Sequence, residues 1–249
     1  MLSKSQSKRI TSLGQKKYRI KEQAFVAEGV KVIQELLDST FKLDGLWVEE
    51  EAAFAKALSA QNITFETVTA QELKKVTFLS TSQTALAIFK IPAAESKKRE
   101  GLTLVLDDVR DPGNLGTIIR LCDWFGITEL VCSKQTVDCY NPKVVQATMG
   151  SLTRVQISYE DLNAYLASEK RPVYGTFMDG EDIYKSVLPK EAILVMGNEA
   201  NGISAEIESL VTNRLGIPRF GPQQATESLN VATATAICLS EFRRSSLVY

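Results

Sequence analysis

The chain has 249 residues, of which 44% are hydrophobic and 24% are charged, close to the averages of soluble globular proteins. A formal net charge of −1 excludes a protein that neutralises nucleic acid along its whole surface. The sequence contains no histidine, which excludes a Ser-His-Asp triad, a Cys-His pair, an HExxH zinc site and a histidine general base.

The N-terminal segment is strongly basic, because every charged residue before Glu22 is Lys or Arg. It has no apolar run of the kind found in secretory signals, and no stretch of the chain is long and apolar enough to span a membrane. We therefore expect no membrane association and a cytoplasmic location. The basic segment indicates either a phosphate-binding surface or the solvated face of a terminal helix.

Residues 1–95 predict a small domain of alternating helices and strands. Apolar residues at helical spacing predict a helix over 28–37, and Thr69 is a candidate N-cap for a helix over 69–76. Further elements are a helix with a loop over 12–25, strands over 43–50, 63–68 and 84–90, and a helix over 50–61. This alternation favours a mostly parallel sheet.

A polar stretch after Pro92, which includes Lys97-Lys98-Arg99, predicts an interdomain linker over 96–101. Residues 102–249 then predict a second α/β domain. It starts with LTLVLDDV, a continuous apolar run suited to a strand that is buried on both faces. Further predicted strands cover 129–133, 154–158, 172–177, 192–197 and 214–218, and predicted helices cover 118–125, 142–149, 159–168, 205–211 and 230–243.

Three strand ends of the second domain lead into polar, glycine-containing loops: DPGNLGTIIR, MGNEANGIS and IPRFGPQQATESLNVATA. Ligands of open α/β sheets bind beyond the carboxyl ends of strands, where loops and helix N-termini supply donors. The P-loop and GxGxxG patterns are absent, so the ligand differs from those of the common nucleotide folds. Helix capping or surface ion pairing would also account for each polar residue taken singly. The candidate residues are Asn114, Arg120, Asn198, Glu199, Ser228 and Asn230.

The four cysteines, Cys122, Cys132, Cys139 and Cys238, form no CxxC pair. Without histidine, a mononuclear zinc site would need carboxylates or all four thiolates. We therefore predict no metal site and interpret the cysteines as buried thiols of a reducing compartment.

In order and spacing, the three loops resemble the signature motifs of the SpoU (TrmH) branch of the SPOUT RNA methyltransferases, and the resemblance covers residues 102–243. It implies a SPOUT-type α/β domain with a deep trefoil knot. Residues 1–95 resemble, less specifically, the family's α/β/α RNA-binding domain, which is related to ribosomal proteins. Their basic start, FVAEGVKVIQELL and STSQTALAIF carry that likeness.

The resemblance implies transfer of a methyl group from S-adenosyl-L-methionine to a ribose 2′-hydroxyl of RNA, within a homodimer and without a metal. Such a displacement demands positioning and loss of the 2′-OH proton, and it needs no histidine. By resemblance, the catalytic residues are Asn114, Arg120, Ser228 and Asn230. The methyl donor would be held around Thr176, Gly197, Asn198, Glu199, Ile217 and Leu229, and Lys8, Arg9, Lys16, Lys17 and Arg19 would contact RNA.

Several questions stay open at this level. Arg120 is either a general base, the role assigned in relatives, or a group that positions a phosphate or the 2′-oxygen. A guanidinium keeps its proton in proteins, which favours positioning. The third loop is longer than usual by Pro222-Gln223-Gln224, with an unknown effect on the site. A substrate-binding domain ahead of the catalytic domain favours rRNA over tRNA as the substrate. The alternative function is that of a non-catalytic RNA-binding or ribosome-assembly factor on the same fold.

Overall fold

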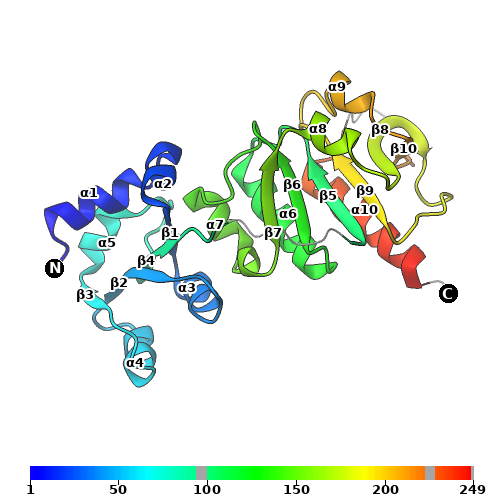
Figure 1. The fold of residues 1–249 in the computed structure, drawn as a ribbon. Helices are drawn as coiled ribbons and strands as arrows, with labels where there is room; N and C mark the ends of the chain where they lie inside the picture. The colour runs from blue at the N-terminus through cyan, green and yellow to red at the C-terminus, as the bar shows by residue number, and fades with distance from the viewer. Residues whose placement is uncertain (94–99, 222–227, 248–249) are drawn as a thin grey trace. The chain divides into compact units, whose positions relative to one another are not determined.

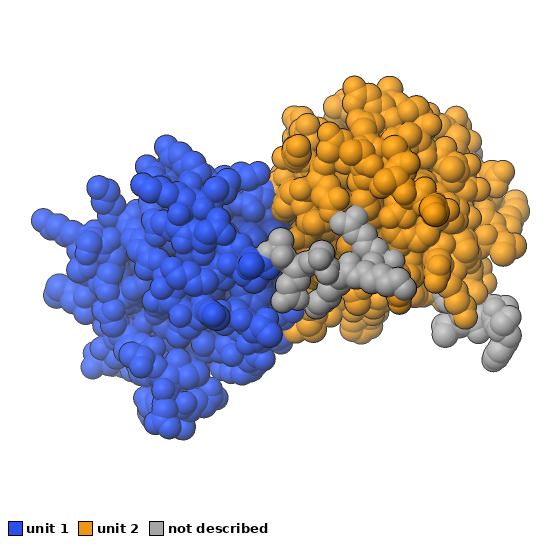
Figure 2. Space-filling view, viewed as in Figure 1, with its two compact units in different colours: residues 1–95, 138–153 blue, residues 96–137, 154–249 orange. Residues whose placement is uncertain are grey.

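The computed structural model describes residues 1–93, 100–221 and 228–247 (Figure 1). Its internal contacts define two units: unit 1 holds residues 1–95 and 138–153, and unit 2 holds residues 96–137 and 154–249 (Figure 2). Most of the predicted linker 96–101, and Pro222, Gln223 and Gln224 of the third loop, lie outside the described residues.

Unit 1 contains the strands and helices expected for the N-terminal domain, with one addition that the sequence patterns did not reveal, a buried strand at Ala24–Glu28. The terminal helix considered for the basic segment is present at Lys4–Ser12. Thr69 caps its helix as predicted, and its side chain accepts a hydrogen bond from the Glu72 backbone N–H. The helices are α1 (Lys4–Ser12), α2 (Lys16–Glu22), α3 (Val30–Leu37), α4 (Ala53–Ala60), α5 (Ala70–Val76) and α7 (Pro142–Thr148), and the strands are β1 (Ala24–Glu28), β2 (Leu43–Glu49), β3 (Glu66–Val68) and β4 (Ala85–Lys90).

The sheet of unit 1 has the order β1-β4-β2-β3 and is mixed. β4 runs antiparallel to both β1 and β2, and only β2 and β3 pair in parallel. The expectation of a mostly parallel sheet is therefore wrong for this unit. The alternation of helices and strands predicted which elements form. It does not determine the direction in which β4 runs between β1 and β2.

Residues 138–153 pack with unit 1, although the sequence groups them with the second domain. The predicted helix over 142–149 is present as α7, and it packs against β1. Just before α7, the Tyr140 ring lies 4.8 Å from the Phe25 ring, measured between centroids. Asp138 accepts a hydrogen bond from Arg19, with 2.6 Å between Nη2 and Oδ2. These contacts join residues that lie more than a hundred positions apart, which no local pattern reveals.

Unit 2 is built on a six-stranded sheet of order β10-β8-β9-β5-β6-β7, in which every pairing is parallel. The central strands β5 and β9 are buried along their whole length, and the burial of β5 confirms the interpretation of LTLVLDDV as a strand covered on both faces. The strands are β5 (Leu102–Leu106), β6 (Glu129–Ser133), β7 (Gln156–Glu160), β8 (Val173–Asp182), β9 (Ala192–Met196) and β10 (Asn213–Gly216).

Helices cover both faces of this sheet, and alternate residues of each strand point to opposite faces. Val105 and Val195 belong to a core cluster with residues of α8 (Leu162–Ala167) and α9 (Ala205–Glu208). On the other face, Tyr174 packs edge-on against Phe242 of α10 (Val231–Leu247), which in turn packs against α6 (Pro112–Trp124). Figure 1 shows α10 behind the sheet and α8 in front of it. Because all strands are parallel, their carboxyl ends meet at one edge, where the three polar loops begin.

Candidate active site

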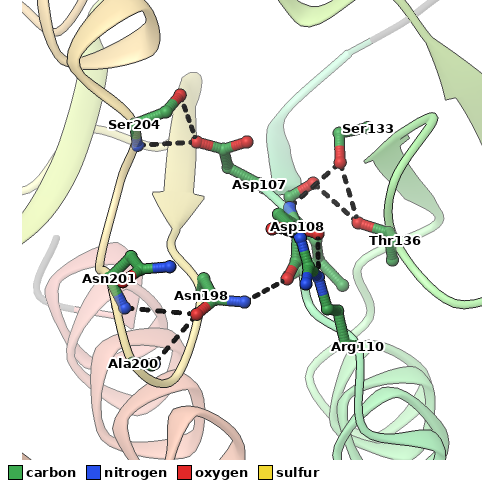
Figure 3. A network of polar contacts seen from close by, with 10 residues as sticks. Asp107, Asp108, Arg110, Ser133, Thr136, Asn198, Ala200, Asn201 and Ser204 are labelled. Carbon is green, nitrogen blue, oxygen red and sulfur yellow. Dashed lines mark hydrogen bonds and ion pairs between the residues drawn. The ribbon is translucent and has the colours of Figure 1, made fainter.

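The loops after β5 and β9 are tied together by a network of polar contacts at the carboxyl ends of these strands (Figure 3). Asp107 directly follows β5 and is only 7% exposed. Its Oδ2 accepts two hydrogen bonds from Ser204, one from the backbone N–H at 2.8 Å and one from Oγ at 2.7 Å. The buried carboxylate thereby fixes the end of the β9 loop against β5.

Asp108 occupies the left-handed backbone region, with φ at +60°, which non-glycine residues adopt at a cost. Its backbone is held from two sides. The N–H donates to Ser133 Oγ at 3.0 Å, and the carbonyl accepts from Asn198 Nδ2 at 2.7 Å. Its carboxylate accepts two hydrogen bonds from Arg110, from Nε at 2.8 Å and from Nη2 at 2.7 Å.

The loop after β9 makes a tight turn that depends on its own side chains and glycines. Asn198 and Gly202 form a bridge through two backbone hydrogen bonds, and Asn198 Oδ1 accepts from the backbone N–H groups of Ala200 and Asn201. A Cβ atom on Gly197 would lie 2.2 Å from the carbonyl carbon of Gly202. Gly197 is thus required by the packing of the loop itself, whatever the loop binds.

Three of the predicted residues, one from each loop, form a continuous hydrogen-bonded chain. Asn114 Nδ2 donates to Glu199 Oε1 at 2.9 Å, and Asn230 Nδ2 donates to Asn114 Oδ1 at 2.9 Å. Asn230 also accepts from the Ala232 and Thr233 backbone N–H groups at the start of α10. The capping role considered for Asn114 belongs instead to Asp111, whose side chain accepts from the Asn114 N–H.

Arg120 and Ser228 are exposed and stand apart from this chain. Within the described ranges, neither forms a hydrogen bond or ion pair through its side chain. Asp123, three positions along α6 from Arg120, pairs with Arg154 at 2.9 Å. Arg120 therefore presents an open guanidinium to solvent on α6.

The predicted donor-binding residues come from several elements. Gly197, Asn198 and Glu199 follow β9, Ile217 follows β10, Thr176 lies within β8, and Leu229 lies just before α10. A small groove of about 220 Å³ is lined by Ile217 together with Met178, Gly180, Asp182, Gly216, Pro218 and Arg219. Leu229 is 48% exposed. Thr176 does not direct its hydroxyl to open space but donates to the Val195 carbonyl at 3.5 Å. Gly180 packs against the backbone of Leu215, where an added Cβ would lie 2.2 Å from a carbonyl carbon, so β8 and β10 approach closely beneath the groove.

The predicted RNA-contacting residues of unit 1 divide into two groups. Lys8, Lys16 and Lys17 are exposed on α1 and α2. Arg9 is partly engaged by ion pairs with Glu22 and Asp44. Arg19 is only 2% exposed.

The Arg19 guanidinium donates to Asp138 and to the carbonyls of Leu13 and Gly14. Its side chain stabilises the start of the chain, and the structure removes it from the RNA-contacting set.

All four cysteines are buried and form no disulfide. Burial raises the pKa of Cys238 to about 12, which leaves this thiol protonated and unreactive near neutral pH. In the part of the chain that the structure describes, no group of three or more Cys, Asp and Glu side chains is arranged to hold a metal ion. No helix within the described ranges is long and apolar enough to cross a bilayer.

The sequence analysis missed the residues that hold the loops, namely Asp107, Asp108, Arg110, Ser133 and Ser204. Asp107 and Asp108 lie at the carboxyl end of the predicted run LTLVLDDV, and Arg110 lies directly before the first loop. Polar residues at the carboxyl end of a predicted strand are a usable signal. Ser133 and Ser204 carry no local signal, because their partners lie 25 and 97 positions away.

Comparison with protein families gives two matches that together span most of the chain. The model of the SpoU rRNA Methylase family matches residues 101–240. The model of the MRM3-like substrate binding domain matches residues 4–87.

Individual relatives agree with these matches. The chain is 31% identical over 232 residues to the 23S rRNA (guanosine(2553)-2′-O)-methyltransferase RlmP of Bacillus subtilis, covering 92% of each protein. It is similar to a solved TrmH-family structure from Porphyromonas gingivalis, at 42% identity and a TM-score of 0.87, covering 98% of this chain and 99% of the other. An AdoMet-bound rRNA methyltransferase from Sinorhizobium meliloti is 31% identical with a TM-score of 0.82, covering 98% of this chain and 97% of the other.

Proposed function

Because the chain belongs to the SpoU rRNA Methylase family, we propose that it transfers a methyl group from S-adenosylmethionine to a ribose 2′-hydroxyl of ribosomal RNA. The observation that carries this proposal is the hydrogen-bonded chain of Glu199, Asn114 and Asn230. It joins the three signature loops at the edge of the sheet where α/β proteins bind their ligands.

The residues around the groove fit a donor of this kind. Met178, Ile217 and Pro218 supply apolar atoms against which a nucleoside can pack, and the remaining, mainly polar lining from β8 and the end of β10 supplies hydrogen-bonding groups. When bound, the donor supplies a methyl group on a sulfonium, which the 2′-oxygen attacks as the carbon–sulfur bond breaks. We assign donor binding to Gly197, Asn198, Glu199, Ile217 and Leu229, with Thr176 acting through the β9 backbone.

The protein's own contribution to this reaction is positioning. Asn114 is oriented from both ends, since its amide donates to Glu199 and its carbonyl accepts from Asn230. A side chain fixed in this way holds the loops in a single arrangement before substrate binds. Ser228 lies two positions before Asn230 in the third loop, and its side chain is exposed, so an incoming ribose can reach it. The exposed guanidinium of Arg120 is suited to orient a phosphate or the 2′-oxygen.

We assign RNA binding to residues 1–95, joined through 96–101 to a methyltransferase domain over 102–249. Lys8, Lys16 and Lys17 present charge to solvent and supply the electrostatic attraction to phosphates. Arg9 adds charge that its two acidic neighbours partly offset.

A homodimer completes the site in this proposal. Six residues along an α-helix turn the side chain by about 600°, so Arg120 points roughly 120° away from Asn114 and about 9 Å further along α6. One protomer therefore does not bring the two together. Trp124 lies one turn beyond Arg120 and is 83% exposed, which favours a covering partner. We further propose the trefoil knot of the SPOUT fold and a cytoplasmic location.

The test is methyl transfer from radiolabelled S-adenosylmethionine to an unmodified transcript of Bacillus subtilis 23S rRNA, with the methylated nucleotide located by primer extension. Label in one ribose 2′-position is the expected result. The alternative, a non-catalytic RNA-binding or assembly factor, predicts RNA binding without label. Labelling of tRNA in place of rRNA would correct the substrate and keep the reaction.

A further inference from the structure

The Asp108–Arg110 pair has features that protein stability does not explain. Arg110 is two positions from Asp108 in the sequence, and its side chain is 71% exposed. Ion pairs of this kind at a surface contribute little to stability. Asp108 nevertheless has a left-handed backbone conformation, and its backbone N–H and carbonyl are held in place by Ser133 and Asn198. Strain of this kind is typical of functional sites.

The geometry of the pair leaves the outer edge of the guanidinium open. Asp108 occupies Nε–H and one Nη2–H of Arg110, which are two of the five N–H donors of an arginine side chain. Of the remaining three donors, one N–H of Nη1 and the second N–H of Nη2 lie along the edge that these two nitrogens form. That edge matches two oxygens of a phosphate group, which a guanidinium binds through parallel hydrogen bonds.

Arg110 also lies close enough to the hydrogen-bonded chain of the site to interact with it electrostatically. The hydrogen bond to Asp108 is the main cause of a raised pKa for Arg110, and attraction to Glu199 adds to it. Glu199 is the residue that accepts from Asn114. Asn198, next to Glu199, donates to the Asp108 carbonyl. The loop after β9 therefore contacts Asn114 through Glu199 and Asp108, the partner of Arg110, through Asn198.

We propose that Asp108 is a positioning residue that holds Arg110 to bind a phosphate of the RNA backbone beside the ribose that is methylated. This inference rests on the proposed function and identifies the part of the substrate that the first loop recognises. The interaction is with the backbone, so it positions the ribose without selecting the base.

The test uses Asp108→Gly, because glycine adopts a positive φ without strain and cannot hold Arg110. A purely structural role for Asp108 predicts a variant with a lower melting temperature and, once folded, unchanged kinetics. Our proposal predicts a melting temperature at least as high as that of the wild type, with kcat/KM for the 23S rRNA transcript lowered about tenfold. Asn62→Gly is the matched control, since Asn62 also has a positive φ, at +57°, and is exposed in unit 1. It should keep the kinetics of the wild type.

Arg110→Ala separates the phosphate contact from the conformation of Asp108. It should lower kcat/KM at least as much as Asp108→Gly. It should also reduce the slope of log affinity against log salt concentration by about one, while S-adenosylmethionine affinity stays unchanged. Arg154→Ala removes a comparable surface ion pair of unit 2 and should change none of these values.

Wild-type kinetics for Asp108→Gly, or an unchanged salt slope for Arg110→Ala, would overturn the proposal. Loss of S-adenosylmethionine binding in Arg110→Ala would do so as well, because it would place Arg110 at the donor. If the wild-type protein transfers no methyl group, the proposed function fails, and the salt slopes of RNA binding still decide whether Arg110 contacts phosphate.

Discussion

Asn230 donates a hydrogen bond from Nδ2 to Oδ1 of Asn114 at 2.9 Å, although the two residues are 116 positions apart. The same Asn230 accepts from two backbone N–H groups at the start of α10 through its Oδ1. One side chain therefore begins a helix and orients a residue of another loop. These two functions can be separated by substitution.

Asn230→Asp tests the orienting function. The carboxylate keeps the cap of α10, because it still accepts from the Ala232 N–H, but it cannot donate to Asn114. We expect kcat to fall tenfold to a hundredfold, roughly the effect of a misplaced catalytic group, with a nearly unchanged melting temperature. Asn141→Asp, at the N-terminus of α7, is the control for the same chemical change at a cap. A large loss of stability in Asn230→Asp would instead indicate that the capping role dominates.

Asn114 and Arg120 should act from different protomers. Neither Asn114→Ala nor Arg120→Ala is expected to transfer methyl groups alone. A heterodimer of the two variants, co-expressed with different affinity tags, should regain about half of the wild-type activity, since one of its two sites would be intact. If both residues act within one protomer, the heterodimer will be inactive. Sedimentation of the purified species checks that it is a dimer.

Donor binding is better tested at Ile217 than at Gly197. A side chain at position 197 would clash with the loop backbone, so Gly197→Arg would disrupt the loop whether or not a ligand binds there. Ile217 lines the groove and is half-buried. Ile217→Arg adds bulk and a positive charge beside a cationic donor. We expect calorimetry to show loss of S-adenosylmethionine binding in a protein that still melts cooperatively, and retained affinity would place the donor elsewhere.

We expect the basic residues of unit 1 to fall into two groups. The exposed lysines should affect RNA binding, and the buried Arg19 should affect stability. Replacing Lys8, Lys16 and Lys17 by Ala should lower the salt slope of RNA binding by about two to three. Arg19→Ala should destabilise unit 1 by about 3–5 kcal/mol, because it leaves the Asp138 carboxylate without its buried partner. Chemical denaturation and filter binding measure the two effects. The prediction for Arg19 is wrong if Arg19→Ala keeps the stability of the wild type and binds RNA more weakly.

Glu28 should make the stability of unit 1 depend on pH. Burial raises the pKa of its carboxyl above the ordinary value of 4.5, although hydrogen bonds from Thr77 and Phe78 oppose the shift. The stabilising contribution is complete below pH 4.5. It is lost as the pH rises through the raised pKa, because the unfolded chain releases its proton first.

Glu28→Gln tests this pH dependence, since a neutral amide can accept from the Phe78 N–H and donate to the Thr77 hydroxyl. Its melting temperature should exceed that of the wild type by an amount that grows from pH 4.5 to pH 7. Glu50→Gln, at an exposed position, is the control and should follow the wild type. Parallel melting curves for wild type and Glu28→Gln would refute the prediction.

The sequence by itself determined the elements whose causes are local. The continuous apolar run of β5 predicted a buried strand, because a strand covered on both faces has no side chain that must be polar. Thr69 predicted a helix start because its side chain and Glu72 satisfy each other's backbone N–H groups within one turn. The order of three loop motifs was likewise readable along the chain, and it led to Asn114, Glu199 and Asn230.

Tertiary structure alone decided which groups are in contact. It placed β4 between β1 and β2, turned Arg19 from a candidate phosphate ligand into a buried partner of Asp138, and joined Asn114 to Asn230. It also showed that Asp108 has a strained backbone supported by Ser133 and Asn198. Local propensities extend over a few residues, whereas these contacts form only when distant segments pack together. The free energy that stabilises them therefore comes from burial and hydrogen bonding across the whole fold.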